Sequence, residues 1–288
     1  MAGDNDDSQG SSGRAVAVWT FVTSTASKLT GGMVGVAVTS ATANPFLGVA
    51  TATTLAQALE KGGAYVVHLM IGPRQKIRAG RAIEVAAVRM QDRIINGEVV
   101  RTDLFVEPRP DGRSDADEVV ESVLQASINS AEEKKVDFLA AMMTSVFMDS
   151  SIRAADAQQM IEIAQGLRYR SLIVLKITNN VHVHRWPARG GDKVPGPPAR
   201  LYPLMAQIYD LCRQGLIEMK DRLEDRDVYL VAAAGDIDPA KLHLSPLGRS
   251  LYEIMELKRL SEADPTYVET LADLGALSGY GQGHSGQF

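Results

Sequence analysis

The chain has 288 residues, of which 45% are hydrophobic, 23% are charged and 6% are aromatic. This length suits two or three compact units, and a composition rich in alanine and glycine but poor in aromatics favours closely packed helices over a β-sandwich. The net charge of −5 argues against non-specific binding of nucleic acid by the whole chain. Cys212 is the only cysteine, which excludes a disulfide framework and is typical of a reducing cytoplasm.

Residues 29–59 form a long run without any charged side chain. A helix needs about 20 apolar residues to cross a bilayer, so the run is long enough. Small residues recur at every fourth position, a spacing that lets helices pack closely in lipid: Gly31, Gly35, Thr39 and Ala43. Several threonines lower the hydropathy, and Pro45 disfavours helix at Asn44. Two interpretations stay open, a segment that enters the membrane conditionally and a buried helical hairpin.

A second apolar patch, residues 62–73, is followed abruptly by positive charge. The first cations after it are Arg74, Lys76, Arg78 and Arg81. Basic residues that flank an apolar run favour anchoring at the cytoplasmic face of a membrane. The alternative is a solvated basic helix that follows a buried hairpin.

The middle of the chain predicts a bundle of amphipathic helices. Ser114 and Asp117 form an S-x-x-D pattern, which is typical of a helix N-terminus. Apolar residues then recur at helical spacing in four stretches with short connections: residues 119–128, 136–147, 157–167 and 172–177. Short connections between such helices indicate a compact bundle.

The C-terminal part resembles a winged-helix pattern. A helix is expected over residues 201–214, strands at 216–219, 228–232 and 241–244, and a further helix from Ser245, with Ser245 as N-cap and Pro246 at the first position. DNA reading is weakly supported, because Arg213 is the only cation in the first of these helices.

Together these patterns predict a mainly α fold with five parts. They are a disordered acidic tail, a Gly/Ala-rich apolar helical segment with a basic flank, a helical bundle, a winged-helix-like domain with a small β-hairpin, and a flexible tail. The boundaries are 1–13, 14–106, 114–180, 199–260 and 261–288.

A group of cations interleaved with aromatics lies near the end of the predicted bundle, a composition that suits phosphate binding and base stacking. The group comprises Arg168, Tyr169, Arg170, His182, His184, Arg185, Trp186 and Arg189. We expect it to be a nucleotide- or oligonucleotide-binding surface. The alternative is a solvated surface beside a loop.

Catalytic and metal motifs are absent from the sequence. The glycine pattern at Gly281, Gly283 and Gly286 has neither a following helix nor a βαβ unit, so it does not predict a dinucleotide site. His182 and His184 lack a nearby third ligand. The sequence therefore predicts no catalytic residues, no metal site and no cofactor.

Three segments, residues 132–177, 207–219 and 243–257, carry a resemblance to known proteins. Their order after an apolar N-terminal segment is similar to the abortive infection alpha family and to membrane effectors of phage-defence systems such as Hailong. The resemblance covers roughly residues 28–257 and rests on layout and soft motifs.

The resemblance implies a bacterial anti-phage effector that damages the membrane through a pore or channel when triggered. It also implies a homo-oligomer. A triggered effector needs a sensing surface, and we expect the group of cations and aromatics to provide it, so that a nucleotide or oligonucleotide ligand, or a partner protein such as a defence enzyme, controls the protein. The expected location is the bacterial inner membrane, or the cytoplasm with conditional membrane association. Two alternatives from other classes are a soluble winged-helix DNA-binding regulator and a non-catalytic adaptor for a partner enzyme.

Overall fold

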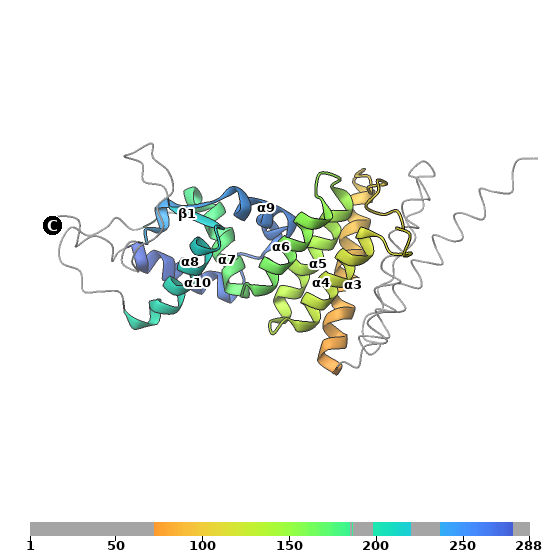
Figure 1. Ribbon diagram of the computed structural model, residues 1–288. Helices are drawn as coiled ribbons and strands as arrows, with labels where there is room; N and C mark the ends of the chain where they lie inside the picture. Colours follow the sequence, from red (N-terminus) through yellow and green to blue (C-terminus); the bar gives the residue numbers. More distant parts are fainter. Residues whose placement is uncertain (1–71, 185, 187–197, 220–236, 279–288) are drawn as a thin grey trace, which may run out of the picture. The chain divides into compact units, whose positions relative to one another are not determined.

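A computed structural model describes residues 72–184, 186, 198–219 and 237–278. Within these ranges the chain is mainly helical, with eight α-helices and a two-stranded antiparallel sheet (Figure 1). The predicted fold class is confirmed at that level. The predicted membrane segment, with Gly31, Gly35, Thr39 and Ala43, lies outside the described residues, as does the predicted strand at 228–232. The chain divides into two compact units between Gly166 and Leu167.

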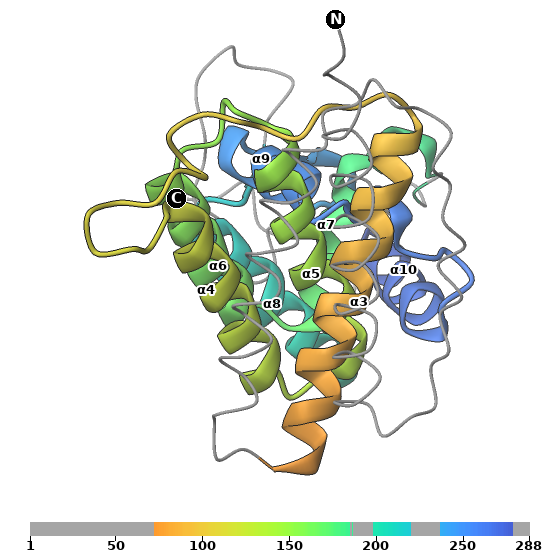
Figure 2. The ribbon, with the colours of Figure 1, turned by 90° about the vertical axis from the view of Figure 1, so that its right-hand side faces the viewer.

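The first unit contains four helices that lie side by side (Figures 1 and 2). They are α3 (Pro73–Ile95), α4 (Asp115–Asn129), α5 (Glu133–Met148) and α6 (Ala154–Gly166). Helices α3 and α6 each pack against both α4 and α5. Helix α5 is buried almost all round, and its Leu139, Met142 and Phe147 are among the largest fully buried side chains. Met142 and Met143 of α5 are therefore part of the core.

Helix ends in the first unit are held by side chains. Ser114 caps α4 by accepting from the backbone N–H of Asp117 at 3.1 Å, and the Asp117 carboxylate accepts from the Ser114 N–H at 3.0 Å. This capping box confirms the S-x-x-D prediction. At the end of α5, the buried Arg101 guanidinium donates to the carbonyls of Val146 and Ile152. Val146 lies in the last turn of α5, where carbonyls have no partner within the helix, and Ile152 lies in the loop before α6.

The second unit is built around α7 (Tyr169–Asn179), whose residues are nearly all buried. A helix that is buried on all sides must be covered by other elements. The elements that contact α7 are α8 (Tyr202–Arg213), β2 (Leu242–Leu244), α9 (Pro246–Ile254), the 3-10 turn η5 (Leu257–Arg259) and α10 (Pro265–Ser278). The remaining short turns are η1 (Val181–Val183), η2 (Ala199–Leu201) and η4 (Pro239–Lys241).

The small sheet joins β1 (Ile217–Met219) to β2, with Ile217 opposite Leu244. The helix that follows β2 begins where the sequence predicts. Ser245 is its N-cap, accepting from the N–H of Gly248 at 2.9 Å, and the Ser245 N–H donates to the carbonyl of Leu216 at 3.1 Å. These bonds draw the first turn of α9 against the backbone at the start of β1.

Two of the predicted boundaries differ from the structure. Residues 261–288 were predicted to be a flexible tail, but α10 occupies part of this range and buries Tyr267, Thr270 and Leu274. The bundle was predicted to span 114–180 and to be separate from 14–106. Instead, α3 packs with α4 and α5, and α7 belongs to the second unit, because its apolar surface is covered by α8, α9 and α10.

Candidate functional site

Tyr169 and Arg170, two residues of the predicted ligand-binding group, are engaged inside the second unit. The Tyr169 hydroxyl donates to the carboxylate of Asp264 at 3.2 Å. The Arg170 guanidinium donates to the carboxylate of Asp273 at 2.7 Å and to the hydroxyl of Thr270 at 3.2 Å. Both contacts reach α10 or the residue just before it. They attach α10 to the first turn of α7, and they occupy groups that a phosphate would otherwise bind.

His184 and Trp186 form a second cluster, just beyond the end of α7. Their rings meet edge to face with centroids 5.7 Å apart, and the Trp186 indole N–H donates to the carbonyl of Val181 at 3.0 Å. Burial lowers the pKa of His184 below its ordinary value, which keeps the ring neutral at pH 7. His182 is exposed on the 3-10 turn.

The remaining members of the predicted group are not joined to either cluster. Arg168 is exposed immediately before α7. Arg185 and Arg189 lie outside the described residues. In the structure, Tyr169 and Arg170 both bond to α10 or the residue before it, and His184 contacts Trp186. The predicted residues therefore form two separate clusters.

Lys176 is a buried cation near the second cluster. Its ammonium group donates to the carbonyls of Lys258 at 3.2 Å and Leu260 at 2.5 Å, and it lies 3.6 Å from the carboxylate of Glu262. The contacts pair its charge and tie η5 to α7. Lys176 is the only charged residue in the apolar run at 172–177, and this position indicates a buried cation. It was not identified from the sequence.

Two buried polar atoms near Glu262 lack a hydrogen-bond partner within the described residues. They are the Nε2 of His184 and the hydroxyl of Tyr267. Burial raises the pKa of Tyr267, and the carboxylate of Glu262 raises it further. His184 and Trp186 offer aromatic surface, which suits stacking of a planar ligand better than proton transfer.

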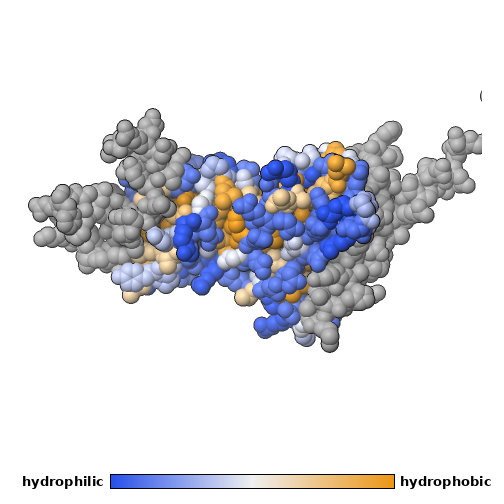
Figure 3. Space-filling model, in the orientation of Figure 1, coloured by the Kyte–Doolittle hydropathy of each residue, from blue (hydrophilic) through white to orange (hydrophobic). Residues whose placement is uncertain are grey.

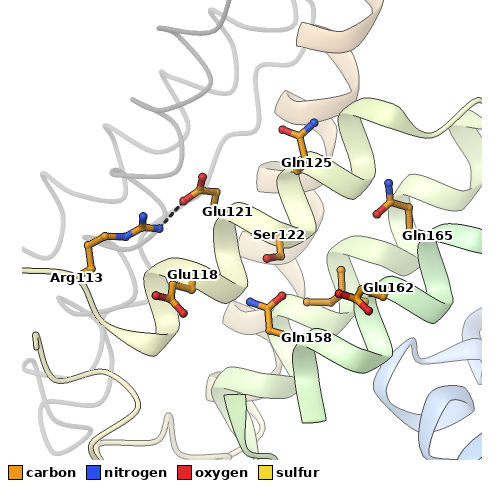
Figure 4. Close-up of a pocket in the computed structure, with 9 residues that line it drawn as sticks. Arg113, Glu118, Glu121, Ser122, Gln125, Gln158, Glu162 and Gln165 are labelled. Atoms are coloured by element: carbon orange, nitrogen blue, oxygen red, sulfur yellow. Dashed lines mark hydrogen bonds and ion pairs between the residues drawn. The ribbon is translucent and has the colours of Figure 1, made fainter. Parts of the chain in front are cut away.

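A polar groove of about 470 Å³ lies between α4 and α6 in the first unit (Figure 4). Glutamate, glutamine and serine side chains from the two helices line it, and Ile161 is its only apolar lining residue. Arg113, from the loop before α4, pairs with Glu121 at one end (Figure 4). Glu118 pairs with Arg109 of the same loop. The lining provides hydrogen bonds and negative charge, but no histidine, cysteine or lysine for acid–base or nucleophilic catalysis.

Two other titratable groups, the half-buried Cys212 and the buried Lys135, have shifted pKa values. Burial raises the pKa of the Cys212 thiol to about 11, so the thiol is protonated and a poor nucleophile at neutral pH. Burial lowers the pKa of Lys135 to about 8. Its amine donates to the carbonyl of Gln165 at 2.7 Å, near the end of α6, where a cation complements the helix dipole. Lys135 is therefore a structural contact between α5 and α6.

The first two turns of α3 concentrate exposed positive charge. Arg74 and Lys76 are exposed, Arg78 is partly exposed, and the first turn contains no acidic residue. None of the three forms an ion pair with another described residue. Arg81, one turn further on, differs because its guanidinium is paired with Asp137 at 2.8 Å.

Among the described helices, none combines the length and the apolarity that a bilayer crossing requires. The described residues also contain no group of histidine, cysteine and acidic side chains arranged to hold a metal ion. Comparison with protein families, with curated proteins and with solved structures finds no match to this chain.

Proposed function

We propose that the protein is a membrane-perturbing effector of a bacterial anti-phage or abortive-infection system. In this proposal residues 29–59 act on the bilayer, and the start of α3 lies at its anionic surface. The resemblance of the sequence layout to abortive infection and phage-defence effectors supports the defence role. The charge-free length of residues 29–59 supports the membrane role.

The observation that carries the proposal is the placement of Arg74, Lys76 and Arg78. The N-terminus of a helix carries partial positive charge, so Arg74 and Lys76 in the first turn oppose the dipole by about 0.3–1 kcal/mol each. Their charge does not stabilise the helix, and no described carboxylate pairs with them. An anionic lipid surface would stabilise all three, at about 1 kcal/mol per basic residue. Their position directly after the apolar patch at 62–73 would place that surface beside the N-terminal segment.

The second unit is proposed as the regulatory part. Its order of α8, β1, β2 and α9 supports a winged-helix-like module. Arg213, the exposed cation at the end of α8, is already paired with Asp210 at 3.1 Å, which favours a ligand- or partner-binding role over DNA reading. His184 and Trp186 are the described residues best suited to a nucleotide ligand. A homo-oligomer, or a partner defence enzyme, would couple ligand binding to the membrane segment.

Vesicle binding tests the proposal directly. The full-length protein is sedimented with vesicles of phosphatidylcholine, with or without phosphatidylglycerol. The variant Arg74→Glu, Lys76→Glu, Arg78→Glu should bind anionic vesicles at least about 100-fold more weakly than wild type. Three lost contacts of about 1 kcal/mol each account for that factor.

A matched variant controls for net charge. Arg213→Glu, Arg249→Glu and Lys258→Glu change three exposed cations of the second unit by the same total charge. This control should bind anionic vesicles like wild type apart from a small general effect of net charge. Equal weakening by the two triple variants, or no binding by wild type, would overturn the proposal.

A further inference from the structure

Exposed aliphatic side chains are concentrated in one short part of the described chain. The described residues expose nine large hydrophobic side chains, and five of them lie between residues 77 and 104. They are Ile77, Val88, Ile95, Val99 and Leu104, with exposures of 47%, 38%, 61%, 64% and 79%. Single exposed apolar residues are ordinary, but a concentration of this kind indicates a surface that is covered by something else.

Three of these residues share one face of α3. Val88 follows Ile77 by eleven residues and Ile95 follows Val88 by seven, which are about three turns and about two turns of helix. Val99 and Leu104 are exposed in the loop that leaves the helix, and Figure 3 shows a small hydrophobic patch at that end of the first unit. Arg81 and Glu84 lie on the same face between Ile77 and Val88, so an ion-paired cluster of Arg81 with Glu84 and Asp137 interrupts the row on the helix. We call Ile77, Val88, Ile95, Val99 and Leu104 the α3 apolar row.

The chain itself supplies an occupant of suitable chemistry and position. The described residues begin at Gly72, next to the first residue of α3, and residues 29–59 precede them as the longest charge-free run. The twelve residues 60–71 can span about 40 Å, and a helix of 23 residues such as α3 is about 35 Å long. Residues 29–59 can therefore reach every part of the row.

We infer that the α3 apolar row is the docking surface for residues 29–59 of the same chain in the resting state. Docking buries apolar surface of both partners while the protein is in water. Lipid competes for the same segment, so the row sets how readily residues 29–59 leave for a bilayer. This role rests on the proposed function, whereas the docking contact itself can be measured without a membrane.

Photo-crosslinking of the full-length protein tests the contact. Val88→p-benzoylphenylalanine is irradiated in the absence of lipid, and crosslinked peptides are mapped by mass spectrometry. Crosslinks should fall within residues 29–59. The matched control is Val268→p-benzoylphenylalanine, at a valine of α10 with 57% exposure, which should give none there. Absence of crosslinks from Val88 to residues 29–59 overturns the inference.

A mixture of unlabelled and nitrogen-15-labelled chains identifies which copy supplies the segment. The inference predicts that crosslinked pairs carry a single label. Pairs of mixed label would show that a second copy occupies the row, which contradicts docking in the same chain.

A second readout uses substitutions in place of a probe. Val88→Lys with Ile95→Lys should release residues 29–59 and speed chymotryptic cleavage after Phe46 at least tenfold. Val183→Lys with Val268→Lys, at exposed residues of the second unit, should leave that rate unchanged. An unchanged rate in the first variant contradicts the inference. If crosslinks form but wild type fails to bind anionic vesicles, the docking contact stands and the proposed function fails. If wild type binds anionic vesicles but no crosslinks to residues 29–59 form, the docking contact is rejected and the proposed function stands.

Discussion

Replacing Gly248 by alanine places two physical effects in opposition. In the middle of a helix, alanine is ordinarily about 1 kcal/mol more favourable than glycine. At this position, however, an added Cβ would lie 1.9 Å from the carbonyl oxygen of Leu216 and 2.9 Å from its carbonyl carbon. Both obstructing atoms belong to the backbone, so no side chain can rotate away. The first turn of α9 would have to move about 1 Å or more from the start of β1.

The expected loss follows from the contacts that this movement breaks. Overpacking of a well-packed site costs about 1–3 kcal/mol. The bond from the Ser245 N–H to the Leu216 carbonyl, and the cap from Ser245 to Gly248, contribute about 1 kcal/mol each. After the gain in helix propensity, Gly248→Ala should lower the free energy of unfolding of the second unit by about 2–4 kcal/mol.

Urea denaturation followed by the fluorescence of Trp186 measures this loss in the second unit. The background substitution Trp19→Phe removes the other tryptophan. Gly275→Ala in α10 is the matched control, because its Cβ would meet no atom within 4 Å. It should stabilise the unit by up to about 1 kcal/mol. If Gly248→Ala is as stable as wild type, the close approach between α9 and β1 is incorrect.

Three further changes probe other contacts. Asp273→Asn should cost about 2 kcal/mol in chemical denaturation, because it removes a charge-assisted partner of Arg170, and Arg170→Gln added to it should cost little more. Arg101→Lys should lower the thermal midpoint almost as far as Arg101→Met, because lysine lacks the fork that reaches two carbonyls and Asp103 together; a midpoint close to that of wild type would contradict this. The pKa of Lys135 falls from 10.5 unfolded to about 8 folded, so the charged amine disfavours folding below pH 8. The free energy of unfolding should therefore rise relative to Lys135→Met between pH 8 and 10, and parallel pH curves for the two proteins would refute this role.

Local patterns predicted the parts of the fold that depend on neighbouring residues. The S-x-x-D pair at Ser114 appears as the capping box of α4, and Ser245 caps α9 with Pro246 at its first position. The expected helix at 201–214 corresponds to α8, and the strands at 216–219 and 241–244 correspond to β1 and β2. In each case the signal is a capping residue, a proline or a periodic spacing of apolar residues, and it lies within a single helix or strand.

Local patterns could not predict contacts between residues that are far apart in the sequence. The composition around Arg170 indicated a ligand surface, but its partner Asp273 lies 103 residues away. Only the packing of α10 on α7 brings the two together. Helix α10 itself was missed, because the glycine-rich end at 279–288 made the whole range resemble a tail. The groove between α4 and α6 also depends on how two helices pack, which their separate sequences do not specify.

Dye release from anionic vesicles tests the central claim most directly. The full-length protein, at a concentration that saturates vesicle binding, is compared with Leu47→Arg in the middle of residues 29–59. A charge at mid-depth costs about 2.5–3.5 kcal/mol on insertion scales. Wild type should release the dye, while Leu47→Arg should bind the vesicles through the cations of α3 and release at least tenfold less. Equal release by the two proteins, or no release by vesicle-bound wild type, would contradict the account.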